Sequence, residues 1–143
     1  MSTLDGGLYD ILRENMRYAH LQRIESSLTG LGIPDINVCH GGREAWIEAK
    51  QTDGWKPKIR GAQVGWAETR VRYGGHVILM TRRHCRAGVR RAAADELWIH
   101  WGGDIRKVYT EGLTAAEPMV PPMPGGPAKW DWEVVRNVVF NLA

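Results

Sequence analysis

Two carboxylates and a lysine lie within sixteen residues of each other, in segments whose patterns are typical of β-strands. Glu48 and Lys50 are two residues apart in segment 44–50, whose apolar residues alternate, and Asp35 begins a second such segment, 35–39. Side chains at positions i and i+2 of a strand point to the same face. We therefore expect Glu48 and Lys50 to project together, and Asp35 to join them if the two strands are neighbours.

These residue types are the ones that metal-assisted hydrolysis of a phosphodiester bond requires. Carboxylate oxygens bind hard divalent cations such as Mg²⁺ or Mn²⁺. A bound cation lowers the pKa of a water molecule and stabilises negative charge on the phosphate. A lysine ammonium can orient that water or neutralise the developing charge. The sequence thus indicates a hydrolytic site for a phosphodiester.

Each motif taken alone has an ordinary structural interpretation. Proline and aspartate both favour turns, so Gly-Ile-Pro-Asp at 32–35 indicates a turn. Glu48 and Lys50 alone indicate a solvated strand face. However, Trp46 shares their face, which is unusual for a surface that only contacts water. Gln63 follows on a predicted helix, and the order of all these features favours a site.

The same residues resemble a known family. The order Gly-x-Pro-Asp at 32–35, Trp-Ile-Glu-x-Lys at 46–50 and Gln-x-x-Trp at 63–66 is similar to the PD-(D/E)XK nuclease superfamily. The form of the motifs looks like the VRR-NUC type, and especially like the small stand-alone versions found in phages. The resemblance extends over about residues 8–83 and implies a restriction-endonuclease-like αβββαβ core.

The resemblance implies a role for each matching residue. Asp35 and Glu48 would bind Mg²⁺ or Mn²⁺, with the carbonyl of Ala49 as a further ligand. Lys50 would be the charge partner of the attacking water or of the phosphate. Independently of the resemblance, Gln63 and Tyr73 fall on one stripe of the helix predicted at 59–73. That position places the Gln63 amide at the rim of the site, where it could touch a catalytic group or a DNA phosphate.

Members of this superfamily often carry an additional acid on the first helix. Glu14 is the candidate by position in the predicted helix. Glu25 competes with it, because Arg-Ile-Glu at 23–25, just before the Pro-Asp turn, resembles a stretch in phage relatives. Both alternatives stay open, and Glu25 is the preferred catalytic candidate.

The function implied by the resemblance is a divalent-metal-dependent endodeoxyribonuclease acting on branched or structured DNA, such as Holliday junctions, as a homodimer. Site-specific or nicking cleavage of duplex DNA is an alternative. A non-catalytic nucleic-acid-binding module that keeps this fold is the alternative from another class. The two carboxylates argue against it, because a pure binding module has no use for carboxylates that face a phosphate.

Positive charge is concentrated in residues 56–91, which contain ten Lys or Arg and a single acid. That segment carries +9, so the net charge of +3 leaves −6 for the rest of the chain. Such a run is usually a solvated face. Here it begins directly after the predicted site, and cationic surfaces attract DNA through counterion release. The predicted DNA-binding residues are Lys56, Lys58, Arg60, Arg82 and Arg83.

The composition is that of an ordinary globular protein, and 143 residues are typical of one domain. No apolar run is long enough for a membrane span, and the N-terminus has no signal-peptide pattern, so we expect a cytoplasmic protein without a membrane partner. Each of the two cysteines adjoins a histidine, at 39–40 and 84–85, a spacing unlike that of zinc ligands. Two isolated cysteines indicate no disulfide scaffold.

The periodicity predicts an α/β (α+β) fold, in which helices flank a mixed central sheet. The expected core, about 8–91, is a helix at 8–18, strands at 20–26, 35–39 and 44–50, a helix at 59–73 and a strand at 76–80. A C-terminal extension, about 92–143, adds strands at 96–101 and 105–109, a proline-rich loop at 118–127 and a helix at 130–140. We expect residues 1–143 to form one nuclease domain, in which the extension serves as structural cover, dimer surface or substrate clamp.

Overall fold

A five-stranded mixed sheet forms the centre of the computed structural model, which describes residues 5–25 and 30–141. The strands, in spatial as well as chain order, are β1 (His20–Arg23), β2 (Ile36–His40), β3 (Arg43–Thr52), β4 (Val77–Cys85) and β5 (Ala94–Trp101). Neighbouring strands are antiparallel except β3 and β4, which are parallel. The parallel pair needs a long connection, and α3 (Gly61–Arg72) lies within it. The predicted α+β fold with its helix, three strands, helix, strand order is confirmed.

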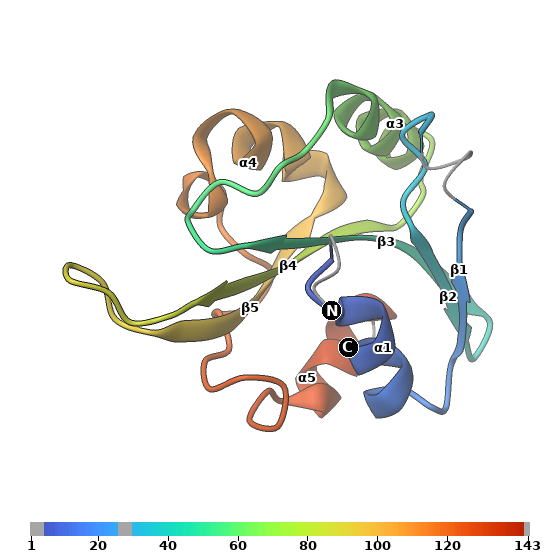
Figure 1. The fold of residues 1–143 in the computed structure, drawn as a ribbon. Helices are drawn as coiled ribbons and strands as arrows, with labels where there is room; N and C mark the ends of the chain where they lie inside the picture. The colour runs from blue at the N-terminus through green and yellow to red at the C-terminus, as the bar shows by residue number, and fades with distance from the viewer. Residues whose placement is uncertain (1–4, 26–29, 142–143) are drawn as a thin grey trace.

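Helices cover both faces of the sheet (Figure 1). α1 (Leu8–Asn15) and α5 (Trp132–Val139) lie on one face, and α3 and α4 (Ile105–Glu111) lie on the other. The strand residues that pack under α1 and α5 alternate, as a half-buried strand requires; they are Ile36, Val38, Ala45, Ile47, Ala49, Ile78, Met80, Leu97 and Ile99. The opposite core contains Val77, Leu79 and Trp98 of the sheet with Val64, Ala67, Ile105 and Val108 of the helices. The predicted apolar side of the third strand is therefore confirmed.

The C-terminal extension is built into the same sheet and core. β5 completes the sheet, and Val135 and Val139 of α5 are fully buried in the cluster that also holds α1. α5 begins after Asp131, whose side chain accepts a hydrogen bond from the Val134 N–H at 3.2 Å. The proline-rich segment 118–127 runs beside β5, where it forms backbone hydrogen bonds with the strand. This half of the chain thus covers the outer edge of the sheet.

The strand predicted at 105–109 is wrong, because this segment is the helix α4. β-branched and aromatic residues favour strands, and Ile105, Val108 and Tyr109 suggested one. Ile105 and Val108 are three residues apart and both are buried, which is the spacing of one helical face. A short 3₁₀ turn at Gly102–Asp104 leads directly into the helix.

The element ends differ from the predictions in ways that affect the site. β3 continues to Thr52 and β4 to Cys85, beyond their predicted ends, so polar residues extend the sheet. β1 ends at Arg23 rather than at Ser26, and Ser26 lies outside the described residues. The longest helix of the described chain is α3, with twelve residues, and no helix in the described ranges has the length and apolar character needed to cross a membrane.

Candidate functional site

Asp35, Glu48 and Lys50 come together on the face of the sheet that α3 covers. Glu48 of β3 pairs with Leu79 of β4, which packs under α3. Asp35 directly precedes β2, and its Oδ1 accepts a hydrogen bond of 3.0 Å from the Ala49 N–H. Lys50 Nζ lies 3.8 Å from Glu48 Oε2. The three predicted residues therefore form one cluster at the point where β2 begins beside β3.

Glu48 is the electrostatic centre of this cluster. It is only 4% exposed, and its Oε1 is buried without a hydrogen-bond partner among the described residues. The pKa of Glu48 is raised to about 8, mainly by burial and in addition by the charge of Asp35, while Lys50 and Arg60 oppose the rise. Burying a carboxylate costs free energy unless a charged or hydrogen-bonding partner compensates. Lys50 compensates only in part, so the site is suited to a further cation.

The pKa values of Asp35 and Lys50 are also shifted towards the neutral forms. Burial raises the pKa of Asp35, and the charge of Asp5 adds to the rise. The hydrogen bonds that the Asp35 carboxylate accepts from the backbone N–H groups of Ala49 and of Asp35 itself lower the pKa. Burial lowers the pKa of Lys50, while Glu48 and Asp35 raise it. Perturbed pKa values of neighbouring groups are typical of functional sites. A cation between the carboxylates would stabilise their ionised forms.

The turn that carries Asp35 is fixed between two elements. Gly32 has φ +93°, and a side chain there would collide with the carbonyl of Ala62 in the first turn of α3. On the other side, the Ile24 N–H donates a hydrogen bond of 2.8 Å to the carbonyl of Asp35. The Gly-Ile-Pro-Asp turn therefore allows α3 to pack closely against Gly32, and it holds Asp35 beside β3.

Ala49 presents backbone atoms to the same place. The N–H and C=O of one strand residue point to the same side of the strand, so the Ala49 carbonyl is directed towards the segment that carries Asp35. Pro34 in that segment has no N–H to donate to it. Asp35, Glu48 and the Ala49 carbonyl thus offer an all-oxygen donor set, which suits Mg²⁺ or Mn²⁺.

Asp35 and Glu48 are not part of a dense cluster of candidate metal ligands in the described part of the chain. Within residues 5–25 and 30–141, no three His, Cys, Asp or Glu side chains are grouped to hold a metal. Mg²⁺ commonly binds through one or two carboxylates and keeps several waters. Asp35 and Glu48 fit that pattern, and the unpaired Glu48 Oε1 supplies an oxygen for it.

Gln63 is buried at the start of α3, beside the site. Its Oε1 accepts a hydrogen bond of 2.9 Å from the Arg60 N–H, which caps the first turn of the helix. Gln63 is 5% exposed and shares the buried side of α3 with Val64 and Ala67, whereas Tyr73, predicted on the same stripe, is 85% exposed. Gln63 therefore positions Arg60, whose charge reaches both Glu48 and Lys50.

A third acid close to the cluster is Asp5, which lies just before α1. It is 7% exposed and accepts hydrogen bonds from the N–H groups of Gly7 and Tyr9 at 2.9 and 3.1 Å. Its charge raises the pKa of Asp35. An Asp before a helix has a sufficient structural explanation as a cap, so nothing in the sequence marked it as part of the site.

The two acids that the sequence favoured are both exposed. Glu14 is on the outer side of α1, where it forms an exposed ion pair of 3.3 Å with Arg17. Glu25 is exposed just after β1. Neither contributes to the pKa shifts of Asp35 or Glu48.

Thr81 is a further polar residue on the site face. It pairs with Lys50 across β3 and β4, and paired residues point to the same face. Thr81 is fully buried, and its Oγ1 has no hydrogen-bond partner within the described chain. The sequence gives no signal for it, since a threonine at the end of an apolar strand is ordinary.

A cationic cleft of about 640 Å³ opens beside the cluster. It is lined by Lys50, Gln51, Thr52, Asp53, Lys56, Lys58 and Arg60. Lys50 belongs to both the cluster and the cleft, so the cleft leads to the carboxylates. Three of the five predicted DNA-binding residues are thus brought to the site.

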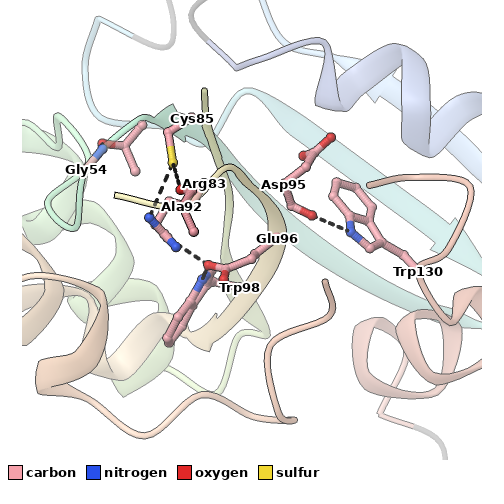
Figure 2. Close-up of polar contacts among 9 residues, drawn as sticks. Gly54, Arg83, Cys85, Ala92, Asp95, Glu96, Trp98 and Trp130 are labelled. Carbon is pink, nitrogen blue, oxygen red and sulfur yellow. Dashed lines mark hydrogen bonds and ion pairs between the residues drawn. The ribbon is translucent and has the colours of Figure 1, made fainter. Parts of the chain in front are cut away.

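The other two, Arg82 and Arg83, are engaged in ion pairs instead. Arg82 forms two hydrogen bonds of 2.8 and 2.7 Å with Asp95, and Arg83 forms one of 2.7 Å with Glu96. Figure 2 shows Arg83 between Glu96 and Cys85, with the Trp98 indole on the same carboxylate. Each of the two arginines is thus paired with an acid of β5. Part of the positive charge that the sequence assigned to DNA binding is therefore neutralised within the protein.

Comparisons of the chain with protein-family models, curated proteins and solved structures found no match. The functional assignment therefore rests on Asp35, Glu48 and Lys50 and on the cleft beside them. Membership of the PD-(D/E)XK superfamily stays a prediction.

Proposed function

We propose that this chain is a divalent-metal-dependent endodeoxyribonuclease of the PD-(D/E)XK type. The observation that carries the proposal is the environment of Glu48: a buried carboxylate with an unpaired oxygen, next to Asp35 and Lys50 and beside a cationic cleft. A carboxylate with a purely structural role is expected to be paired, as Glu96 is with Arg83. Glu48 therefore has the properties of a metal ligand, because it is buried and one of its carboxylate oxygens is unpaired within the described chain.

Each residue of the site then has a chemical task. Asp35, Glu48 and the Ala49 carbonyl would hold Mg²⁺ or Mn²⁺, which when bound acts as a Lewis acid towards phosphate and water. Lys50 orients the attacking water or stabilises the negative charge that develops on the phosphate. The charge of Asp5 raises the pKa of Asp35, so Asp5 would add negative charge near the proposed metal ligands.

The cleft residues position the DNA backbone. Lys56, Lys58 and Arg60 are suited to phosphate contacts, which fix register and orientation but carry no sequence information. Cleavage of branched or structured DNA by a homodimer follows from the family resemblance alone, and we include it in the proposal as the first substrate class to test.

The test is a cleavage assay with linear duplex, nicked, flap and four-way DNA in the presence of Mg²⁺, Mn²⁺ or a chelator. We expect cleavage only with the metals, and none by Glu48→Gln. Glu14→Gln is the matched control, because it makes the same change at an exposed acid. Cleavage in chelator, or full activity of Glu48→Gln, would refute the proposal. DNA binding with no cleavage under any condition would favour the non-catalytic binding module.

A further inference from the structure

Trp55 is a half-exposed aromatic residue on the loop that forms one wall of the cleft. It is 50% exposed, and its near neighbours Asp53 and Lys56 both line the cleft. A side chain of this size gains most when it is buried. Its exposure beside phosphate-binding cations therefore needs an explanation other than packing.

Arg83 and Trp98 contact the Trp55 ring but leave much of it exposed. The guanidinium carbon of Arg83 lies over the ring, 3.9 Å from its centroid. Trp98 packs against it in a T-shaped arrangement, with a centroid distance of 6.0 Å and an interplanar angle of 89°. With both contacts made, half of Trp55 is still open to solvent.

The groups that support the ring are themselves held in place. Arg83 donates a hydrogen bond of 2.7 Å to Glu96 Oε1, and the Trp98 indole N–H donates one of 3.0 Å to the same oxygen (Figure 2). Both residues that contact the Trp55 ring are therefore tied to one carboxylate. This network gives Arg83 a positioning role in place of a direct contact with DNA.

The backbone of Trp55 is fixed as well. Its carbonyl accepts a hydrogen bond of 2.7 Å from the Leu113 N–H. Gly112, at φ +102°, permits this close approach, because a Cβ there would lie 2.8 Å from the Trp55 carbonyl oxygen. Ordering the ring in advance reduces the entropy that is lost when a ligand binds.

A fixed, half-exposed aromatic ring beside a cationic groove is the arrangement that binds single-stranded nucleic acid. Bases stack on such rings while the backbone follows the positive charge. In an intact duplex both faces of each internal base are already stacked on neighbouring bases, so a base must be unpaired or turned out to reach the ring.

We propose that Trp55 stacks on an unpaired nucleobase of DNA whose backbone lies in the cleft. The preferred substrate is then DNA with a single-stranded or distorted region next to the cleavage site. This inference rests on the proposed function, because it names the substrate of the same cleft, but the stacking can be measured without cleavage.

The test uses forked DNA with 2-aminopurine at an unpaired position, because the fluorescence of this base decreases when it stacks. Binding is measured with Glu48→Gln in Mg²⁺, so that the DNA stays intact. We expect fluorescence to decrease on binding, and Trp55→Ala in the same background to abolish that decrease. Trp55→Ala should also weaken binding of the forked DNA between roughly fivefold and a hundredfold. Trp55→Phe should restore part of both effects.

Two controls make the measurement specific. Trp101→Ala removes another half-exposed tryptophan, 43% exposed at the far end of β5, and should change neither signal. Blunt duplex DNA should bind Trp55→Ala and its parent equally, because it offers no unstacked base to the ring. Thermal melting of the Trp55 variants checks that the fold is kept.

The outcomes separate this inference from the proposed function. A fluorescence decrease that persists in Trp55→Ala, or an equal loss of affinity for forked and blunt DNA, overturns the stacking. Metal-dependent cleavage by the wild type without Trp55-dependent stacking overturns the inference alone. Trp55-dependent stacking in a protein that cleaves no DNA supports the inference and overturns the nuclease proposal.

Discussion

The charged residues of β3 and those at the junction of β4 and β5 form two regions that differ in how closely their charges are paired. At the junction, each of two neighbouring arginines pairs with an acid of β5 at 2.7 Å. In β3, Lys50 approaches Glu48 only to 3.8 Å, and the second oxygen of Glu48 is unpaired. The two regions lie on adjacent strands of one sheet and share a similar residue composition.

The pKa shifts differ in the same way. At the junction the hydrogen bond between Arg83 and Glu96 raises the pKa of the arginine and lowers that of the acid, so both stay charged. In β3 burial raises the pKa of Glu48 and lowers that of Lys50. A buried ionisable group without a matching partner therefore marks a candidate site more sharply than the number of charges in a segment does.

The largest expected effect is on cleavage. Lys50→Met should lower the single-turnover rate by roughly a hundred- to a thousandfold, because it removes a charge aimed at the reacting phosphate. It should keep the increase in melting temperature expected with Mg²⁺, whereas Glu48→Gln should lose both the rate and the increase, since it removes a proposed metal ligand. Single-turnover cleavage and melting curves with and without Mg²⁺ measure the two effects.

Arg83→Met provides the contrasting result at the junction. It should leave the Mg²⁺-dependent increase in melting temperature intact, since the partners of Arg83 within the described chain, Glu96, Cys85 and Trp55, are not members of the carboxylate cluster. If Lys50→Met abolished the increase as completely as Glu48→Gln, the separation of ligand and charge partner would be wrong.

The next effect is on DNA affinity. Changing Lys56, Lys58 and Arg60 to glutamine should weaken binding to all DNA sequences. It should also reduce the slope of log affinity against log salt, by up to about one unit for each phosphate that the variant no longer neutralises. Binding titrations between low and moderate salt give this slope.

A matched charge control is available on the rest of the surface. Arg13, Lys107 and Lys129 are exposed and do not line the cleft, so their replacement by glutamine gives the same change in net charge. An equal reduction of the slope by both triple variants would mean that binding depends on overall charge and not on the cleft.

At the junction the expected effect is on stability. Arg82→Met should reduce the free energy of unfolding by about 1–3 kcal/mol, because it leaves Asp95 without its two hydrogen bonds and removes a third to the Gly6 carbonyl. Arg17→Met breaks an exposed pair and should cost less than about 1 kcal/mol. Urea unfolding measures the free energy of unfolding of both variants. If Arg82→Met lowered it no more than Arg17→Met does, the pairs at the junction would be no stronger than an exposed pair.

The smallest effect concerns pH. His100 pairs with Leu79 and is fully buried on the sheet face that α3 covers. Its Nε2 lies 2.9 Å from the Leu113 carbonyl oxygen, and burial lowers its pKa. The unfolded chain therefore binds the proton more readily, and stability should fall as the pH drops below the ordinary value of 6.5. The slope contributed by one such group is at most about 1.4 kcal/mol per pH unit.

The measurement must remove the opposing effect of Glu48. Because the pKa of Glu48 is raised to about 8, its contribution to stability is present at low pH and is lost as the pH rises. The comparison should therefore be between Glu48→Gln and a double variant that carries Glu48→Gln and His100→Gln. Urea unfolding between pH 7.5 and 5 should show a flatter profile for the double variant; identical profiles would contradict the assignment. His20→Gln, at an exposed histidine, is the control.

Local patterns were enough to predict the five strands of the sheet and the central cluster, although they also predicted a strand at 105–109 that is a helix. Alternation assigned Glu48 and Lys50 to one face, and a turn of Pro and Asp placed Asp35 at a strand end. Asp5 and Thr81 could not be found in this way, because their importance comes from contacts between distant segments. Asp5 reaches Asp35 across thirty residues of chain, and Thr81 meets Lys50 only through strand pairing.

Charge and propensity were less reliable guides. The sequence shows that Arg82 and Arg83 are basic, but not that β5 brings an acid to each of them. At 105–109 residue preference for strands was outweighed by the helical spacing of Ile105 and Val108. In each case tertiary structure decided a property that local sequence leaves open.

The segment alongside β5 has a consequence for self-association. Met119 and Met123 form backbone hydrogen bonds of 2.8–3.1 Å with Ile99 and Leu97, so the outer edge of β5 is already occupied by the protein's own chain. Open sheet edges are where proteins add strands from other molecules and begin to aggregate. This edge is closed to such additions, and any dimer formed by extension of the sheet would have to use the four-residue strand β1 at the opposite edge.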